Sequence, residues 1–111
     1  MLKLKLREYL SESGRSPFND WLLGLRDLRA RARVEIRLDR VRLGNLGDHA
    51  SLGNGVFELR IFYGPGYRVY YSLEHDNVVL LLLGGTKGTQ KRDIKTAKAY
   101  LHDYRRRESG N

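Results

Sequence analysis

The chain has 111 residues, the usual size of one domain with one hydrophobic core, and we expect a single domain over 1–111. It has no cysteine, which excludes disulfides, thiolate nucleophiles and cysteine-based zinc sites. With 21 Lys and Arg against 13 Asp and Glu, the formal charge is +8, which attracts nucleic acid, the ribosome or an acidic partner unless it serves solubility alone. No apolar run reaches membrane-spanning length and no signal core is present, so we expect a cytoplasmic protein with no membrane association.

The first quarter of the chain predicts a strand and then a helix. Leu2, Leu4 and Leu6 alternate with cationic residues, which is typical of a half-buried strand, here over residues 2–9. Ser16 followed by Pro17 predicts a helix start, because the serine hydroxyl can cap the helix and proline fits its first turn. Apolar residues at helical spacing then form a stripe that should pack on a sheet: Phe18, Trp21, Leu22 and Leu25.

Residues 28–43 fit either a strand or a helix, because their apolar residues alternate and also form one helical stripe. A strand of this length is unusual and the composition favours helices, so we predict a helix. Seven arginines lie between Arg26 and Arg42, and they form either a solvated face or a set of contacts to an RNA backbone. Residues 44–55 are predicted to be a flexible polar loop that contains His49.

The next stretch predicts a β-hairpin that turns over residues 64–66, where two glycines flank a proline. A three-residue turn would set these cross-strand partners: Tyr63 with Tyr67, Phe62 with Arg68, Arg60 with Tyr70, and Glu58 with Ser72. One face is then apolar, and the other gathers Arg60, Arg68 and Tyr70. Two arginines this close repel each other unless an anion or a carboxylate lies between them, so this face predicts a phosphate site. A surface network with Glu58 is the alternative.

The last third of the chain predicts a buried strand over 78–83 and a helix over 90–107. Between them, residues 84–90 are expected to form a glycine-rich loop that brings Lys87 and Gln90 beside the hairpin and offers backbone N–H groups to phosphate. The helix places cations outside, among them Lys91, Arg92 and Lys95. The expected fold class is α+β, in the order β-α-α-β-β-β-α, with a mainly antiparallel sheet packed by helices.

Two segments carry a resemblance to a known family: GVFELRIFYGPGYRVYY and, after the apolar strand, GGTKGTQKRDIKTAKAY. Over nearly its whole length the chain resembles the RelE/ParE toxin superfamily of bacterial toxin–antitoxin modules, most closely its HigB-like addiction module killer protein branch. The resemblance implies a RelE-like fold and a ribosome-dependent endoribonuclease that cuts messenger RNA. It also implies a cognate antitoxin, of helix-turn-helix type, that holds the toxin inactive.

The resemblance implies roles for individual residues. It matches Arg68 with the arginine that faces the scissile phosphate, and Lys87 and Arg60 with basic residues of the site. The chain departs from the best-known members at Glu58, where they carry lysine, and at Asp93, near the place of a catalytic Tyr or His in several members. The candidate catalytic residues are therefore Arg68, Lys87, Arg60, Glu58 and Asp93, and the candidate RNA-binding residues are Tyr70, Gln90, Lys91, Arg92 and Lys95.

The chemistry of RNA cleavage can be assigned to these side chains. The 2′-OH must lose a proton, the phosphorane needs charge stabilisation, and the leaving 5′-oxygen must gain a proton. Arginine suits the second task, because it is always charged and binds phosphate through two N–H groups. Lys87 or Lys91 is the candidate acid, and three residues stand open as the base: Glu58, Asp93 and His49. No metal cluster is apparent, so we expect neither a metal nor another cofactor.

Two other functions fit parts of the same pattern. The basic helical hairpin suits a protein that inhibits DNA gyrase by contact, as the ParE-type members do. The net charge alone suits a non-catalytic nucleic-acid-binding module. An antitoxin should bind the basic surface or the last helix through an acidic or extended element.

Overall fold

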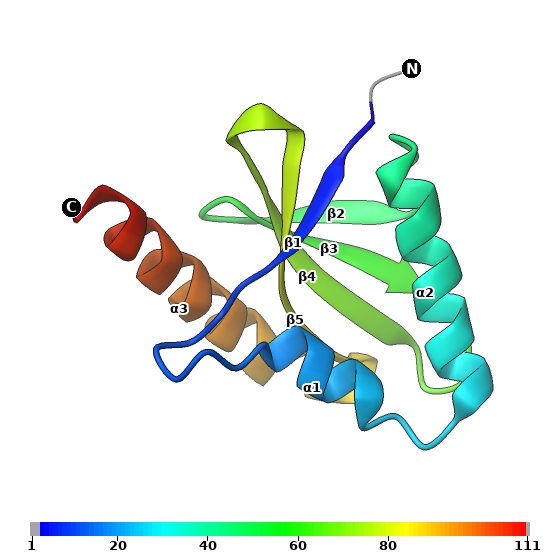
Figure 1. Cartoon of the computed structure of the whole chain (residues 1–111). Helices are drawn as coiled ribbons and strands as arrows, with labels where there is room; N and C mark the ends of the chain where they lie inside the picture. The colour runs from blue at the N-terminus through cyan, green and yellow to red at the C-terminus, as the bar shows by residue number, and fades with distance from the viewer. Residues whose placement is uncertain (1–2, 111) are drawn as a thin grey trace.

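A computed structural model describes residues 3–110, which form a five-stranded sheet between two layers of helix (Figure 1). The elements in chain order are β1 (Lys5–Glu8), α1 (Pro17–Leu23), α2 (Leu28–Arg42), β2 (His49–Gly53), β3 (Val56–Ile61), β4 (Tyr67–Glu74), β5 (Val78–Thr86) and α3 (Gln90–Ser109). The strand order is β1-β5-β4-β3-β2, with β1 parallel to β5 and every other pair antiparallel. The predicted α+β class is confirmed. Over the described residues, no helix is long and apolar enough to cross a membrane.

Helices α1 and α2 form as their local sequence predicts. Ser16 Oγ accepts a 3.0 Å hydrogen bond from the backbone N–H of Asn19, and the Asp27 carboxylate caps α2 by accepting from Arg29 and Ala30. These caps satisfy N–H groups that a helix leaves unpaired at its start. The apolar stripes of both helices pack on one sheet face, with these residues buried: Phe18, Leu22, Ala30, Val34, Leu38 and Val41.

Two predicted elements need correction. The first strand begins at Lys5 rather than at residue 2, and Leu2 lies outside the described residues. The predicted loop over 44–55 contains the edge strand β2, so the order is β-α-α-β-β-β-β-α. The β2 sequence has little strand propensity of its own, and β2 forms by pairing with β3 across a turn where Asn54 and Gly55 both take positive φ.

The predicted hairpin register is also wrong, by two residues. Arg60 lies opposite Arg68, and Glu58 lies opposite Tyr70. The connection between β3 and β4 spans residues 62–66, because Phe62 and Tyr63 leave the strand ladder. The Tyr63 ring stacks on Tyr67 at 6.5 Å between centroids, which favours this longer turn.

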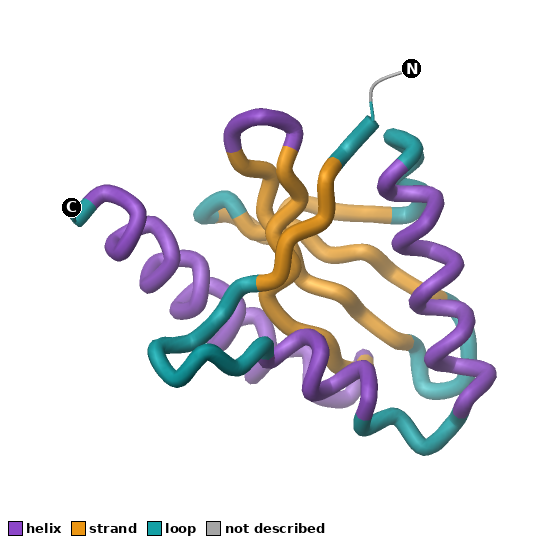
Figure 2. The backbone as a smooth tube through the Cα atoms, viewed as in Figure 1, coloured by secondary structure: helices purple, strands orange, loops and turns teal. Residues whose placement is uncertain are grey.

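Helix α3 covers the sheet face that the hairpin pattern left polar (Figure 2). Its predicted apolar stripe packs on Val56, Tyr70, Leu80 and Leu82, and forms a second core. The Glu58, Arg68 and Tyr70 side chains are consequently buried beneath a helix, whereas the sequence pattern predicts that they face solvent. The sheet thus has two packed faces, and an open site can exist only where its edges and strand ends emerge from the helices.

Tyr9 fastens the segment after β1 to α3, because its hydroxyl donates a 2.6 Å hydrogen bond to Asp103 Oδ2. Burial and the Asp103 carboxylate raise the pKa of Tyr9 to about 12. A tyrosine whose pKa is raised on folding stabilises the fold fully below its ordinary pKa of 10 and loses this contribution as the pH rises through 12. We expect Tyr9→Phe to lose about 1 kcal/mol at pH 7 and to weaken less than the wild type between pH 10 and 12. Thermal unfolding across this range checks it, and an unchanged difference between the two proteins would contradict it.

Candidate functional site

Glu58 and Arg68 form a buried ion pair between β3 and β4, with 3.8 Å between Arg68 Nε and Glu58 Oε1. Glu58 is 3% exposed and Arg68 is 7% exposed. Gln90, the first residue of α3, donates a 2.9 Å hydrogen bond from Nε2 to Glu58 Oε1. Glu58 is therefore held from two sides. A buried carboxylate held in this way fixes the arginine beside it.

The guanidinium of Arg68 has donors to spare. Its Nη1 donates a long 3.4 Å hydrogen bond to the Tyr67 carbonyl, and its buried Nε has no hydrogen-bond partner within the described chain. A guanidinium carries five N–H donors, and burial makes unfilled ones costly. Because the unfilled Nε is buried on the side of Glu58, an anion would have to be bound by the Nη groups.

Arg68 opens onto a shallow hollow of about 350 Å³ at the end of the hairpin, which we call the Arg68 hollow. It is lined by Phe62, Tyr63, Gly64, Pro65, Gly66, Arg68 and Lys87. The backbone N–H of Lys87 donates a 2.7 Å hydrogen bond to the Gly66 carbonyl and so ties the hairpin turn to the end of β5. Two of the predicted cations, Arg68 and Lys87, therefore share one open site.

Exposed cations of α3 lie at a neighbouring hollow. Lys91, Arg92 and Lys95 line it together with Gly88 and Thr89, and its volume is about 450 Å³. All three cations lie on the first turns of α3, whose N-terminus adds positive potential. Of the predicted RNA-binding residues, these three are accessible, whereas Gln90 is occupied by Glu58 and Tyr70 is fully buried.

The segment over 84–90 differs from the predicted phosphate-binding loop. Residues Gly84 to Thr86 complete β5, and Lys87–Thr89 form a single 3-10 turn before α3. Two N–H groups of this segment are already used, since Thr86 donates to Thr89 Oγ1 and Lys87 donates to Gly66. Gly84 has no room for a side chain, because an added Cβ would lie 2.0 Å from the Trp21 ring. The glycines therefore serve close packing here.

Asp93 anchors the start of α3. Its Oδ2 accepts a 2.5 Å hydrogen bond from Thr89 Oγ1, and its side chain is buried against Gly85, where a Cβ would lie 2.0 Å from Oδ2. Tyr70 lies nearby with a hydroxyl that has no hydrogen-bond partner in the described chain. Burial raises the pKa of Tyr70, and the charges of Asp93 and Glu58 add to this effect. Thr89 is a contact that the sequence pattern did not predict, although it stands four residues before Asp93.

Arg60 and His49 lie apart from the Arg68 hollow. Arg60 pairs through Nη2 with Asp48 Oδ1 at 3.0 Å and lines a different hollow beside α2. His49 is exposed, with Nδ1 2.9 Å from the Gly47 carbonyl. It pairs with Leu59, so its side chain shares the α2 face of the sheet rather than the face of Glu58. Arg60 lies directly opposite Arg68 in the β3–β4 ladder, but its guanidinium is not among the groups that line the hollow shared by Arg68 and Lys87.

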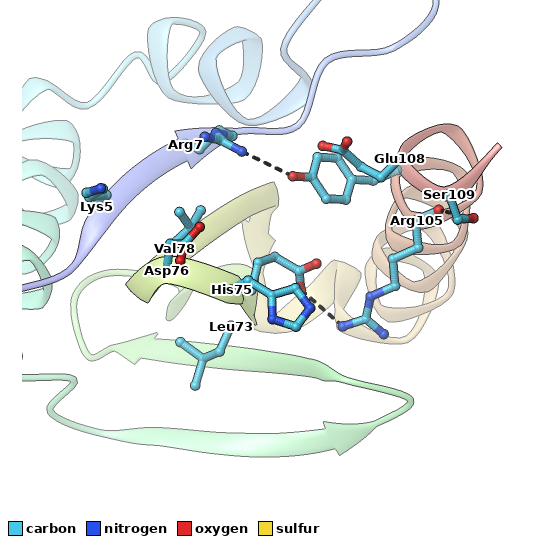
Figure 3. Close-up of a pocket in the computed structure, with 11 residues that line it drawn as sticks. Lys5, Arg7, Leu73, His75, Asp76, Val78, Arg105, Glu108 and Ser109 are labelled. Carbon is cyan, nitrogen blue, oxygen red and sulfur yellow. Dashed lines mark hydrogen bonds and ion pairs between the residues drawn. The ribbon is translucent and has the colours of Figure 1, made fainter. Parts of the chain in front are cut away.

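A larger hollow, of about 850 Å³, lies at the opposite end of the sheet between β1, the β4–β5 turn and the end of α3 (Figure 3). Two of its arginines are already engaged, and its lining includes acidic residues as well as cations. Arg105 on α3 pairs with Glu74 at 3.0 Å, and Arg7 on β1 donates to the Tyr104 hydroxyl. Within residues 3–110, no three His, Asp or Glu side chains gather closely enough to hold a metal ion. The Arg68 hollow is therefore the best candidate site for an anionic ligand.

Fold and site together define an α+β protein of three layers, with a buried carboxylate–arginine pair behind an open basic hollow. No family model matches the chain. It is 49% identical over 81 residues to an "Uncharacterized protein" of Haemophilus influenzae, a match that covers 73% of this chain and 82% of the relative. The chain belongs to the same protein family as this Haemophilus influenzae protein.

Proposed function

We propose that the chain is the toxin of a type II toxin–antitoxin module and acts as a metal-independent endoribonuclease on messenger RNA at the ribosome. The observation that carries the proposal is the Arg68 guanidinium, which lines an open hollow together with Lys87 and is backed by the buried Glu58 carboxylate. The resemblance of the hairpin and of the 84–100 segment to the RelE/ParE superfamily supports the same reaction. The cytoplasm, where ribosomes work, is the proposed location.

Arg68 and Lys87 have distinct tasks in this reaction. The 2′-oxygen attacks the phosphorus while its proton passes to solvent water, and the bond from phosphorus to the 5′-oxygen breaks to leave a 2′,3′-cyclic phosphate. Arg68 stabilises the charge that builds up on the phosphorane oxygens, and its orientation is held by Glu58. Lys87 is exposed and lines the same hollow, so it protonates the leaving 5′-oxygen.

None of the candidate general bases is placed to take the proton of the 2′-OH. Glu58 is buried and engaged by Gln90 and Arg68, and Asp93 is engaged by Thr89, so both act in support of other groups. No carboxylate or imidazole is among the residues that line the Arg68 hollow over the described chain. Charge stabilisation and alignment of the RNA on the ribosome therefore supply most of the rate acceleration.

The cognate antitoxin, proposed to be a helix-turn-helix protein, neutralises this surface. An acidic or extended segment of it would cover the Arg68 hollow and the first turns of α3, where cations are exposed.

Brief induction of the chain in bacteria, followed by mapping of transcript 5′ ends, tests the proposal. We expect growth arrest together with new ends inside translated regions, and loss of the new ends when an inhibitor of initiation, added after the protein has been made, clears ribosomes from messages. Lys87→Ala should fold normally, because Lys87 is exposed, and should produce fewer ends. Growth arrest without new ends would contradict the proposal, and a DNA supercoiling assay would then test gyrase inhibition.

A further inference from the structure

Among residues 3–110, Phe62 is the most exposed of the large apolar side chains, at 78%, and it lies directly after β3. Its backbone position is well fixed. Tyr63 donates from its N–H to the Ile61 carbonyl, and Gly66 donates from its N–H to the Tyr63 carbonyl, both at 3.0 Å. An exposed aromatic ring on a fixed turn loses little further entropy when it contacts a ligand.

The ring of Phe62 lies between two basic hollows. It lines the Arg68 hollow, and it also lines the hollow beside α2, of about 580 Å³, which we call the α2 hollow. Five arginines line the α2 hollow: Arg29, Arg33, Arg37, Arg40 and Arg60. Asp48 is the one acidic residue lining it among residues 3–110, and it is already paired with Arg60. Phe62 therefore lies where the two cationic hollows meet.

Three of these arginines are available to a ligand. Arg37 serves the fold, because it donates to the backbone carbonyls of Leu46, Asp48 and Arg60. Arg29, Arg33 and Arg40 recur at helical spacing along α2, over about 16 Å from first to last. Arg33 lies over the Tyr63 ring at 4.5 Å, which places its guanidinium beside the hairpin turn.

We propose that Phe62 is a stacking platform for an unpaired base of single-stranded RNA, whose flanking phosphates bind the Arg68 hollow on one side and the α2 arginines on the other. Alternation of cations with an exposed ring suits a strand in which every base has an apolar face and every phosphate a charge. This inference rests on the proposed function and adds a position at which RNA is held outside the cleavage step.

Equilibrium binding of the full chain to a short single-stranded RNA tests the proposal, with fluorescence anisotropy as the readout. Riboses carrying 2′-fluorine prevent cleavage, because they lack the attacking hydroxyl. Phe62→Ala should weaken binding about tenfold, as expected for the loss of one base–aromatic stack. Phe62→Trp should bind at least as tightly as the wild type. Phe62→Leu should bind as weakly as Phe62→Ala, because it keeps apolar area without an aromatic face.

Two controls separate stacking from other effects. Leu73→Ala removes another exposed apolar side chain at the far end of β4 and should bind like the wild type. Phe62→Ala should keep the wild-type dependence of binding on salt. Arg40→Ala should reduce the slope of that dependence by about 0.7, because one phosphate contact is lost.

Three results would overturn the inference: wild-type affinity in Phe62→Ala, wild-type affinity in Phe62→Leu, or no RNA binding by the wild type. Uncut transcripts together with the expected Phe62 series would refute the proposed cleavage and leave this inference standing. Cleavage of transcripts together with equal RNA affinity in all the Phe62 variants would support the proposed function and refute the stacking inference.

Discussion

Arg68→Ala is expected to lower the free energy of unfolding by about 3–5 kcal/mol, because it leaves the Glu58 carboxylate buried without its cation. The Gln90 amide remains as a hydrogen-bond donor to Glu58, and one neutral donor does not replace a guanidinium. Urea unfolding of the wild type and the variant measures the difference. A loss below about 1 kcal/mol would show that the pair contributes no more than an exposed one does.

A double variant, Glu58→Leu with Arg68→Met, provides the matched control. Replacing both charges with apolar side chains removes the buried charge altogether, and such replacements are often neutral or stabilising. We therefore expect the double variant to recover most of the stability that Arg68→Ala loses. A double variant as unstable as the single one would mean that packing around Arg68, rather than its charge, holds β3 and β4 together.

Arg68→Lys is expected to keep the fold and lose about 10²–10³-fold in the rate of messenger RNA cleavage. Lysine retains the charge that neutralises Glu58, so the buried pair survives. Lysine lacks the planar fork that contacts two phosphate oxygens at once, so the phosphorane loses directed hydrogen bonds. Cleavage of ribosome-bound message in a purified translation reaction gives the rates, and urea unfolding verifies that the variant is folded.

Arg15→Lys is the matched control for this substitution. Arg15 is an exposed arginine paired with Asp20 near the start of α1, remote in sequence from the hairpin and absent from the lining of the three basic hollows. It should cut at the wild-type rate. Equal rates for Arg68→Lys and the wild type would show that the planar guanidinium is not required for the reaction.

Those parts of the fold that depend on neighbours in sequence could be predicted. The two capped helices follow from Ser16, Asp27 and their apolar stripes, because a helix sets which residues share a face. Strand β2 and the hairpin register could not be predicted in this way. Both depend on contacts between residues that are distant in sequence. The Arg33 guanidinium lies over the Tyr63 ring, and the Arg37 guanidinium donates to the backbone carbonyls of Leu46 and Arg60.

For the candidate site, the sequence predicts which residues take part better than it predicts whether their side chains are buried or already paired. Arg68 and Lys87 lie together as expected, because antiparallel pairing of β4 with β5 brings the start of one beside the end of the other. Glu58 is buried because α3 packs over its face of the sheet. The Arg60 guanidinium points away from the Arg68 hollow because it pairs with Asp48, next to the unpredicted strand β2. Alternation along a strand cannot distinguish a polar face in water from a polar pair beneath a helix.

The parallel pairing of β1 with β5 has a consequence for biosynthesis. Strand β1, which contains Lys5, has no neighbouring strand until Val78 has been synthesised. The Glu58 carboxylate is not held from both sides until Gln90 has been synthesised. A chain that emerges from its amino end therefore cannot complete either the sheet or the setting of Arg68 until residues 78–90 have been made. Contacts between residues this far apart in sequence slow folding, because the connecting chain loses conformational entropy before the stabilising contacts form.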